Sequence, residues 1–268
     1  MQSLTLALIQ TATRWHDPEA NQRLFHDWFD KVPPDSDVVM LPEMFSTGFT
    51  MSSREVAEPM TGPTVEWLQG EAARLNKVLC GSVVIKEKGR YFNRFLWVTP
   101  QGITQSYDKR HRFRMAGEHE HYAAGERRLV FEHAGWRICP MVCYDLRFPV
   151  FFRSRGDYDL VLCVANWPAA RQQAWDTLVR ARAIENQSFL AAVNIVGRDG
   201  NGVDYSGGSV VVDPEGRTLT AAGSDEGVFT ATIEKTALDA YRQQFPAWQD
   251  ADDFTLNEDT RNDEQATR

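Results

Sequence analysis

Residues 136–149 read WRICPMVCYDLRFP, an apolar run from Trp136 to Val142 that ends at Cys143 and passes into a polar turn. The run has the length and the apolar content of a buried strand, and the turn predicts the start of a helix. A side chain placed where a strand gives way to a helix faces free backbone N–H donors and the positive end of the helix dipole, which favour a thiolate. The stretch therefore predicts an α/β fold that displays Cys143 as a candidate nucleophile.

Two other ionisable residues stand directly after apolar segments. Glu43 follows residues 38–42, and the apolar residues on either side of it predict that its carboxylate is partly shielded from water. Lys109 follows residues 103–108 in the same way. A carboxylate, an amine and a thiol, each displayed where a strand ends, form the set of groups that acyl transfer through a covalent intermediate requires.

Each of these residues also has an ordinary structural explanation. A buried cysteine acts more often as a small hydrophobic residue than as a nucleophile, which is our interpretation of Cys139 and Cys163 inside apolar runs. A carboxylate after a strand is commonly a solvated loop residue or a helix cap. Lys109 begins a run of basic residues up to Arg114 that can form a surface stripe. The catalytic interpretation therefore rests on the three positions together.

Strand-like and helix-like segments alternate along the chain, which supports the α/β class. Helical spacing of apolar residues predicts helices over 21–31, 64–76 and 175–184. Residues 86–106 instead predict consecutive strands joined by short turns, so we expect a mixed sheet with antiparallel pairing in this part. The strand candidates, rich in Val, Ile, Leu and Phe, are residues 4–10, 38–42, 78–85, 92–98, 136–142, 160–165, 189–196 and 209–213.

The apolar segments recur from Leu4 to Val228 without a linker rich in Ser, Gly or Pro. This spacing predicts one domain over residues 1–248. Residues 249–268 are acidic and polar, with little apolar content after Leu256. They predict a flexible C-terminal tail, or a tail that becomes ordered only against a partner subunit.

The composition of the 268 residues narrows the class of protein. A formal net charge of -8 disfavours nucleic-acid binding, which draws on clustered Lys and Arg, and favours a small-molecule partner. No stretch approaches the roughly 20 apolar residues of a membrane span, and the N-terminus reads as a strand instead of a signal peptide. The 4 cysteines show neither zinc-finger nor C-x-x-C spacing and predict free thiols. We therefore expect a cytoplasmic protein with no nucleic-acid or membrane partner.

Three motifs follow one another along the chain: Leu41-Pro42-Glu43, Tyr107-Asp108-Lys109-Arg110-His111 and Val142-Cys143-Tyr144-Asp145-Leu146-Arg147-Phe148-Pro149. Together they resemble the nitrilase superfamily of carbon–nitrogen hydrolases, and the match runs from the first strand to about Asp213. Residues 113–119 and 165–168 make the chain most similar to the Nit-type branch and its bacterial omega-amidase members. The resemblance implies a four-layer α-β-β-α sandwich with mixed sheets, whose subunits pair as a homodimer or homotetramer.

The resemblance also implies a role for each motif residue. Cys143 is expected to be the nucleophile, and Glu43 the general base that takes its proton. Lys109 is expected to stabilise the developing oxyanion, with the backbone N–H of Tyr144 as the second donor. No cofactor is implied.

Many members of the superfamily have a second glutamate that orients the lysine and the substrate. Glu118 is preferred here because it stands in the Met-Ala-Gly-Glu register of the Nit-type proteins, and Glu120 is the alternative. His119 and His121 alternate with these glutamates, a pattern that can also bind zinc. Structural zinc needs four protein ligands and catalytic zinc needs three, so we expect no metal.

Substrate recognition is less well defined by the sequence. Phe113, Tyr122 and Trp167 are candidates to wall an apolar slot, and Arg147 or Arg114 is a candidate to bind a substrate carboxylate. Alternatively, the aromatic residues pack in the core, and Arg147 supports the loop around the nucleophile.

The expected reaction is hydrolysis of the terminal amide of a short dicarboxylic monoamide such as 2-oxoglutaramate, through a thioester on Cys143. A nitrile or an N-carbamoyl amino acid is the alternative substrate for the same three residues. A redox-sensing binding module with an exposed, low-pKa cysteine is the alternative outside enzymes.

Overall fold

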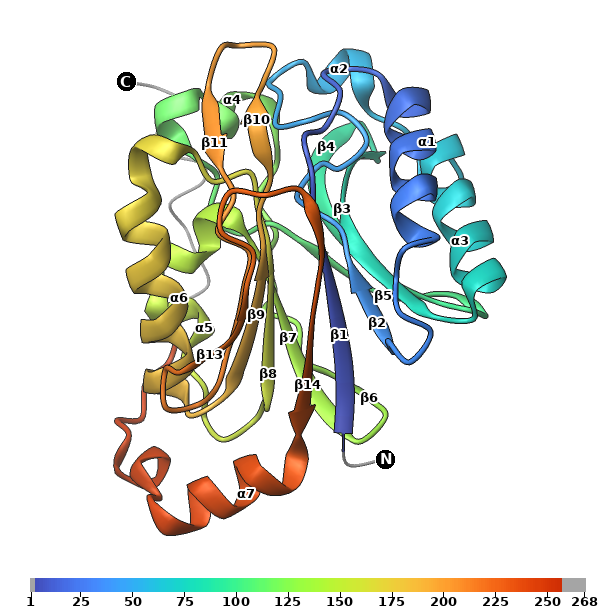
Figure 1. Cartoon of the computed structure of the whole chain (residues 1–268). Coiled ribbons are helices and arrows are strands. Elements are labelled where there is room, and N and C mark those ends of the chain that lie inside the picture. Colours follow the sequence, from blue (N-terminus) through green and yellow to red (C-terminus); the bar gives the residue numbers. More distant parts are fainter. Residues whose placement is uncertain (1–2, 257–268) are drawn as a thin grey trace, which may run out of the picture.

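Two six-stranded sheets stack face to face in the computed structural model, which describes residues 3–256. Helices cover the outer face of each sheet, so the layers run helix, sheet, sheet, helix (Figure 1). The four-layer α-β-β-α sandwich predicted from the sequence is therefore confirmed. Residues 257–268 of the predicted tail lie outside the described residues, and the domain boundary at residue 248 stays a prediction.

The first sheet combines parallel and antiparallel strands. β1, β2 and β3 are parallel neighbours, whereas β4 and β5 follow as antiparallel strands, which confirms the predicted pairing in residues 86–106. β14 closes the other edge by pairing antiparallel with β1. In spatial order the strands are β14 (Gly227–Glu234), β1 (Ser3–Gln10), β2 (Val38–Met40), β3 (Val78–Glu87), β4 (Arg90–Thr99) and β5 (Gly102–Asp108).

The second sheet has three parallel central strands, β7, β8 and β9, with antiparallel strands on both sides. In spatial order its strands are β13 (Thr218–Ala221), β12 (Val210–Val212), β9 (Phe189–Val193), β8 (Leu160–Val164), β7 (Trp136–Val142) and β6 (Phe131–His133).

The predicted strand over residues 189–196 is wrong at its end, because the chain leaves the sheet after Val193. The buried Asn194 side chain donates hydrogen bonds to the carbonyls of Trp167 at 3.0 Å and Gly207 at 2.8 Å, which turns the backbone away. The chain then forms a separate hairpin of β10 (Val196–Arg198) and β11 (Asp204–Ser206), which projects at the top of Figure 1.

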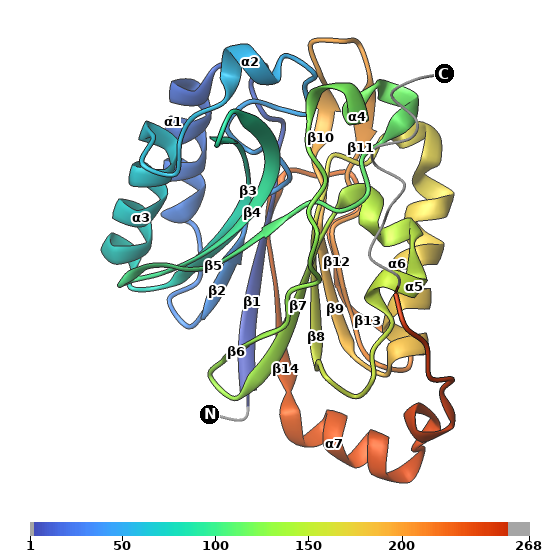
Figure 2. The same cartoon turned by 180° about the vertical axis from the view of Figure 1, so that it is seen from behind.

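The three predicted helices are confirmed in position, with ends shifted by a few residues. α1 (Pro18–Phe29) and α3 (Pro63–Leu75) lie on the first sheet, and α6 (Gln172–Asn186) lies on the second (Figure 2). The shorter helices are α2 (Ser53–Val56), α4 (Glu118–His121), α5 (Pro149–Phe152) and α7 (Lys235–Gln244). Four 3₁₀ turns are η1 (Arg114–Ala116), η2 (Cys143–Arg147), η3 (Ala169–Arg171) and η4 (Ala247–Asp250).

The alternation of side chains along β1 shows how the layers are held together. Leu4, Leu6 and Leu8 point into the core between the two sheets, while Ala7 and Ile9 point into the core beneath α1 and α3. A strand that is buried on both faces has to be apolar at every position, which is why it reads as a continuous hydrophobic run. Within residues 3–256, every helix is too short or too polar to cross a membrane.

Candidate active site

Glu43, Lys109 and Cys143 meet at the edge of the two sheets where β2, β5 and β7 end. The Lys109 ammonium donates a hydrogen bond to Glu43 Oε1 at 2.9 Å, and both side chains are almost wholly buried. Cys143 lines the same cavity as Lys109, and both Glu43 and Lys109 act electrostatically on its thiol. Three residues that lie up to 100 positions apart in the sequence are thus brought to one site.

Two asparagines fix the Glu43 carboxylate in place. Asn93 Nδ2 donates to Glu43 Oε1 at 2.7 Å, and the backbone N–H of Asn166 donates to Oε2 at 2.9 Å. Asn166 Nδ2 also donates to the backbone carbonyl of Glu43 at 2.7 Å. Neither asparagine could be predicted as a partner of Glu43 from the sequence, although Asn166 lies within the motif at residues 165–168, because their position beside Glu43 depends on how the two sheets pack.

Lys109 is shared between two carboxylates. Besides Glu43, it donates to both oxygens of Glu118 at 3.0 Å, and its ammonium lies 5.0 Å from the centre of the Phe49 ring. Burial works against the charged form of Lys109, but the Glu118 and Glu43 carboxylates overcome this effect and raise its pKa. The side chain is therefore a permanent cation at neutral pH.

The structure separates the two glutamates that the sequence left open. Glu118 is fully buried, contacts Lys109, and also accepts a hydrogen bond from the backbone N–H of Phe113. The Glu120 side chain is 69% exposed and points away from Lys109 toward His119, whose Nε2 lies 3.7 Å from it. Burial raises the pKa of Glu118, Lys109 lowers it, and Glu43 adds to the rise, with a net upward shift.

Cys143 has an unusual backbone conformation for a residue with a side chain. Its φ angle is +45°, in the left-handed region that glycine favours, so its side chain leaves the strand end at a sharp angle. It begins the five-residue 3₁₀ turn η2, and the α-helix that follows, α5, has only 4 residues. The turn after the nucleophile therefore does start helical structure, as predicted, in the form of a 3₁₀ turn and one short α-helix.

The thiol environment differs from the prediction. Burial raises the pKa of Cys143 well above its ordinary value, the Glu43 carboxylate adds to the rise, and Lys109 opposes it. The expectation that the strand end favours a thiolate is therefore wrong for the resting protein, because a short 3₁₀ turn has little dipole and the nearest charge is negative. A base must remove the proton before the sulfur can attack.

A cavity of about 960 Å³ opens over Cys143 and Lys109. Phe113, Tyr144, Arg147 and Trp167, all predicted from the sequence, line it. The Arg147 guanidinium lies 4.8 Å from the Trp167 ring centre and so presents its edge to the cavity. Two further candidates lie elsewhere. The Tyr122 side chain is buried and donates to the Thr50 carbonyl at 2.6 Å, and Arg114 is exposed on η1.

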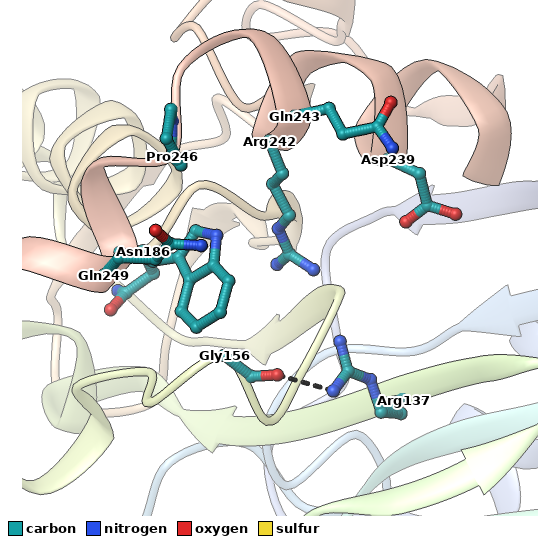
Figure 3. Close-up of a pocket in the computed structure, with 9 residues that line it drawn as sticks. Arg137, Gly156, Asn186, Asp239, Arg242, Gln243, Pro246 and Gln249 are labelled. Carbon is teal, nitrogen blue, oxygen red and sulfur yellow. Dashed lines mark hydrogen bonds between the residues drawn. The ribbon is translucent and has the colours of Figure 1, made fainter.

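A second pocket, of about 340 Å³, lies at the other end of β7 and contains no cysteine (Figure 3). Arg137 reaches into it from β7 and Arg242 from α7, and Arg137 donates a hydrogen bond to the Gly156 carbonyl. Both guanidinium groups bind the buried Asp159 carboxylate, at 2.6 Å and 2.7 Å. Both guanidinium groups are thus engaged in an ion cluster of the fold.

The His and Glu residues of α4 do not assemble into a metal site. Within residues 3–256, no group of three or more His, Cys, Asp and Glu side chains lies close enough together to hold a metal ion. The four cysteines are free thiols.

The four-layer sandwich and the convergence of a thiol, a carboxylate and an ammonium define a cysteine-dependent carbon–nitrogen hydrolase. Residues 5–243 match the family described as carbon-nitrogen hydrolase, and the chain belongs to this family, within the nitrilase superfamily. The protein is thus an enzyme that hydrolyses a carbon–nitrogen bond.

Known relatives are similar along almost the whole chain. "Omega-amidase YafV" of Yersinia enterocolitica is 48% identical, covering 96% of this chain and 100% of the relative. "2-oxoglutaramate amidase" of Bacillus subtilis is 29% identical, covering 92% of this chain and 96% of the relative.

Solved structures agree with the fold. XC1258 from Xanthomonas campestris, a CN-hydrolase superfamily protein with an arsenic adduct in its active site, is 49% identical with a TM-score of 0.93, covering 96% of this chain and 100% of that protein. An amidase from Nesterenkonia sp. AN1, with the acetamide moiety of fluoroacetamide attached to its active-site cysteine, is 25% identical with a TM-score of 0.80, covering 91% of this chain and 95% of that protein.

Proposed function

We propose that the protein is an omega-amidase, which hydrolyses the terminal amide of a short dicarboxylic monoamide such as 2-oxoglutaramate to the 2-oxo acid and ammonia. The observation that carries this proposal is the convergence of three groups: the Lys109 ammonium is hydrogen-bonded to Glu43, and Cys143 lines the same cavity as Lys109. The names of the two relatives reported above support the choice of substrate.

The first half of the proposed reaction forms a thioester. Glu43 removes the thiol proton while Cys143 Sγ bonds to the amide carbon, and the carbonyl electrons move to its oxygen. Lys109 and the backbone N–H of Tyr144 stabilise this oxyanion, and one such donor is typically worth about 3 kcal/mol of barrier. The carbon–nitrogen bond then breaks, and Glu43 returns its proton to the nitrogen, which leaves as ammonia.

The second half releases the acid. Glu43 takes a proton from water, the hydroxide adds to the thioester carbon, and a second oxyanion forms in the same place. The carbon–sulfur bond breaks, and Cys143 recovers its proton from Glu43. Because the pKa of Cys143 is raised in the resting site, Glu43 has to act in concert with the attack instead of meeting a preformed thiolate.

Arg147 is the proposed receptor for the substrate carboxylate. It lines the cavity four positions after Cys143, and its stacking on Trp167 leaves the guanidinium edge free to bind a carboxylate through two hydrogen bonds. Phe113 and Trp167 would then enclose the short carbon chain between the two ends of the substrate.

The proposal is tested by measuring ammonia release from 2-oxoglutaramate, a nitrile of the same chain length and an N-carbamoyl amino acid. We expect the amide to be turned over at least about tenfold faster than the others, and Cys143→Ala to lose about four orders of magnitude of kcat. Cys80→Ala is the matched control, since Cys80 is a buried cysteine on β3 with no reacting partner. Faster turnover of the nitrile or the N-carbamoyl compound would replace the amidase proposal by that alternative.

A second experiment addresses the carboxylate end of the substrate. Arg147→Gln should raise the KM for 2-oxoglutaramate about 30-fold, because a charged bidentate pair is lost, and should leave the KM for a neutral amide such as butyramide nearly unchanged. Arg114→Gln, on the exposed η1 turn, is the control and should leave the KM values for both amides unchanged. Equal effects of Arg147→Gln on both amides would assign Arg147 to support of the loop.

A further inference from the structure

Asp145 is a buried carboxylate that the proposed reaction does not use. It lies two residues after Cys143 and is 0% exposed. Its Oδ2 accepts hydrogen bonds from the Tyr107 hydroxyl at 2.8 Å and from the backbone N–H of Val142 at 3.0 Å. Its Oδ1 accepts from the backbone N–H of His111 at 2.9 Å and from His111 Nδ1 at 2.8 Å. A buried carboxylate that accepts four hydrogen bonds is strongly fixed in position.

The partners of Asp145 belong to the two segments that carry the reacting groups. Tyr107 and His111 stand two positions before and two positions after Lys109, and Val142 directly precedes Cys143. The Tyr107 hydroxyl also accepts a hydrogen bond from the backbone N–H of Arg110 at 3.0 Å, which closes the turn around the lysine. One carboxylate thus ties the lysine segment to the cysteine segment.

We propose that Asp145 is a positioning residue that sets the place of Lys109 relative to Cys143, and that Tyr107 and His111 act through it. This inference rests on the proposed function, because the oxyanion must lie within reach of the lysine while its carbon is bonded to the sulfur. An error of about 1 Å in such an arrangement can cost on the order of 100-fold in rate.

The backbone at Cys143 explains why such a fixed support is needed. A φ of +45° is unfavourable for a residue with a Cβ atom, so the surrounding structure has to impose it. The hydrogen bond from the Val142 N–H to Asp145 holds the chain on the residue immediately before this bend.

Aromatic packing keeps the arrangement dry and in one state. The His111 ring stacks on Phe148 with ring centres 4.0 Å apart, and Tyr107 meets Phe152 edge-on at 6.3 Å. Burial and the Asp145 carboxylate raise the pKa of Tyr107, so its hydroxyl keeps the proton that it donates. Asp145 is 0% exposed and Tyr107 3% exposed, so water has little access to the hydrogen bond between these two side chains.

The test compares Asp145→Asn, Tyr107→Phe and the double variant, with kcat and KM measured for the same amide per folded molecule. In Asp145→Asn, one carboxylate oxygen becomes an NH₂ group that faces existing donors. We expect kcat to fall about 100-fold, with KM changed less than about twofold. Tyr107→Phe should lower kcat about fivefold. The double variant should be no slower than Asp145→Asn alone, because both substitutions break the same connection between the lysine and cysteine segments.

Asp159→Asn is the matched control, since it makes the same chemical change in another fully buried carboxylate that also accepts a backbone N–H. It should lower stability without lowering kcat of the folded enzyme. Three results would each overturn the inference: an unchanged kcat in Asp145→Asn, a rise in its KM as large as the fall in its kcat, or a loss of kcat in the double variant equal to the two single losses combined. If Asp145→Asn does not fold, the kcat and KM of Tyr107→Phe decide alone. Absence of amide hydrolysis by the unmodified enzyme would instead remove the proposed function, and the inference with it.

Discussion

The molecule contains two buried ion clusters of opposite composition at opposite ends of the parallel strands. At the active site, the carboxylates of Glu43 and Glu118 share the single ammonium of Lys109. At the other end, the single carboxylate of Asp159 binds three cations: Arg137 at 2.6 Å, Arg242 at 2.7 Å and Lys235 at 2.8 Å. Figure 3 shows Arg137 and Arg242 facing the same pocket from β7 and α7.

The two clusters shift their carboxyl groups in opposite directions. Burial raises the pKa of Glu118, and Lys109, shared with Glu43, does not fully offset that rise. Burial also works against ionised Asp159, but the hydrogen bonds from Arg137 and Lys235 overcome it and lower its pKa. An excess of cations therefore favours ionised Asp159, whereas the excess of carboxylates in the active site opposes ionisation of Glu118.

We expect the largest effect of all on stability, when the Asp159 carboxylate with its three cationic partners is replaced by a neutral amide. Asp159→Asn should lower the free energy of unfolding by about 3 kcal/mol, because the partly buried cations that link α7 to β7 lose the buried carboxylate that they share. Urea unfolding measures the loss, and kcat of the folded fraction should stay unchanged.

A control for this variant is available on α7. Asp239 also pairs with Lys235, at 3.3 Å, but its side chain is 59% exposed. Asp239→Asn should therefore cost less than about 0.5 kcal/mol of stability. Equal losses in the two variants would show that Asp159 contributes no more than an ordinary surface pair.

The same acid-to-amide change in the active-site cluster should lower activity and leave stability intact. Glu118→Gln should lower kcat about 50-fold, equivalent to about 2 kcal/mol of barrier, because Lys109 loses the partner that aligns it. Its unfolding free energy should be unchanged or higher, since a surplus buried charge is removed.

Glu120→Gln is the natural control, because Glu120 lies two positions away on the same short helix and is mostly exposed. Both kcat and stability should remain at the level of the unmodified enzyme. A strong loss of activity in Glu120→Gln, with none in Glu118→Gln, would reverse the assignment of the two glutamates.

The comparison also shows what the sequence could predict. Strands such as β7 and β8 were found because both of their faces are buried, so they are continuously apolar. β14 and α7 were missed, because most of their residues are partly or fully exposed and Thr and charged side chains interrupt the pattern. The Asp159 cluster therefore combines β7, which was visible in the sequence and carries Arg137, with α7, which was not and carries Lys235 and Arg242.

For the site, the sequence could identify reactive residues but not their relations. Glu43, Lys109 and Cys143 were recognised from three motifs that imply their meeting. The preference for Glu118 over Glu120 came from the resemblance alone, and its contact with Lys109 became visible only when the chain was folded. The link from Asp145 to Tyr107 across 38 positions had no signal in the sequence. The predicted thiolate was wrong because the charge around Cys143 is a sum over residues from several strands.

The smallest effect lies in the acid dependence of stability, and its sign differs between the clusters. Asp159 has a lowered pKa, so its contribution is complete above the unfolded value near pH ~4 and is lost as the pH falls below it. Glu118 has a raised pKa, so ionising it costs stability as the pH rises from ~4 through its folded value. The free energy of unfolding is measured by urea titration between pH 3 and 7. At pH 7 it should be lower in Asp159→Asn than in the unmodified enzyme, and this difference should shrink as the pH falls. In Glu118→Gln the free energy of unfolding should be higher than in the unmodified enzyme at pH 7, and this difference should also shrink as the pH falls. If both differences stay constant with pH, neither carboxyl group changes its pKa on folding.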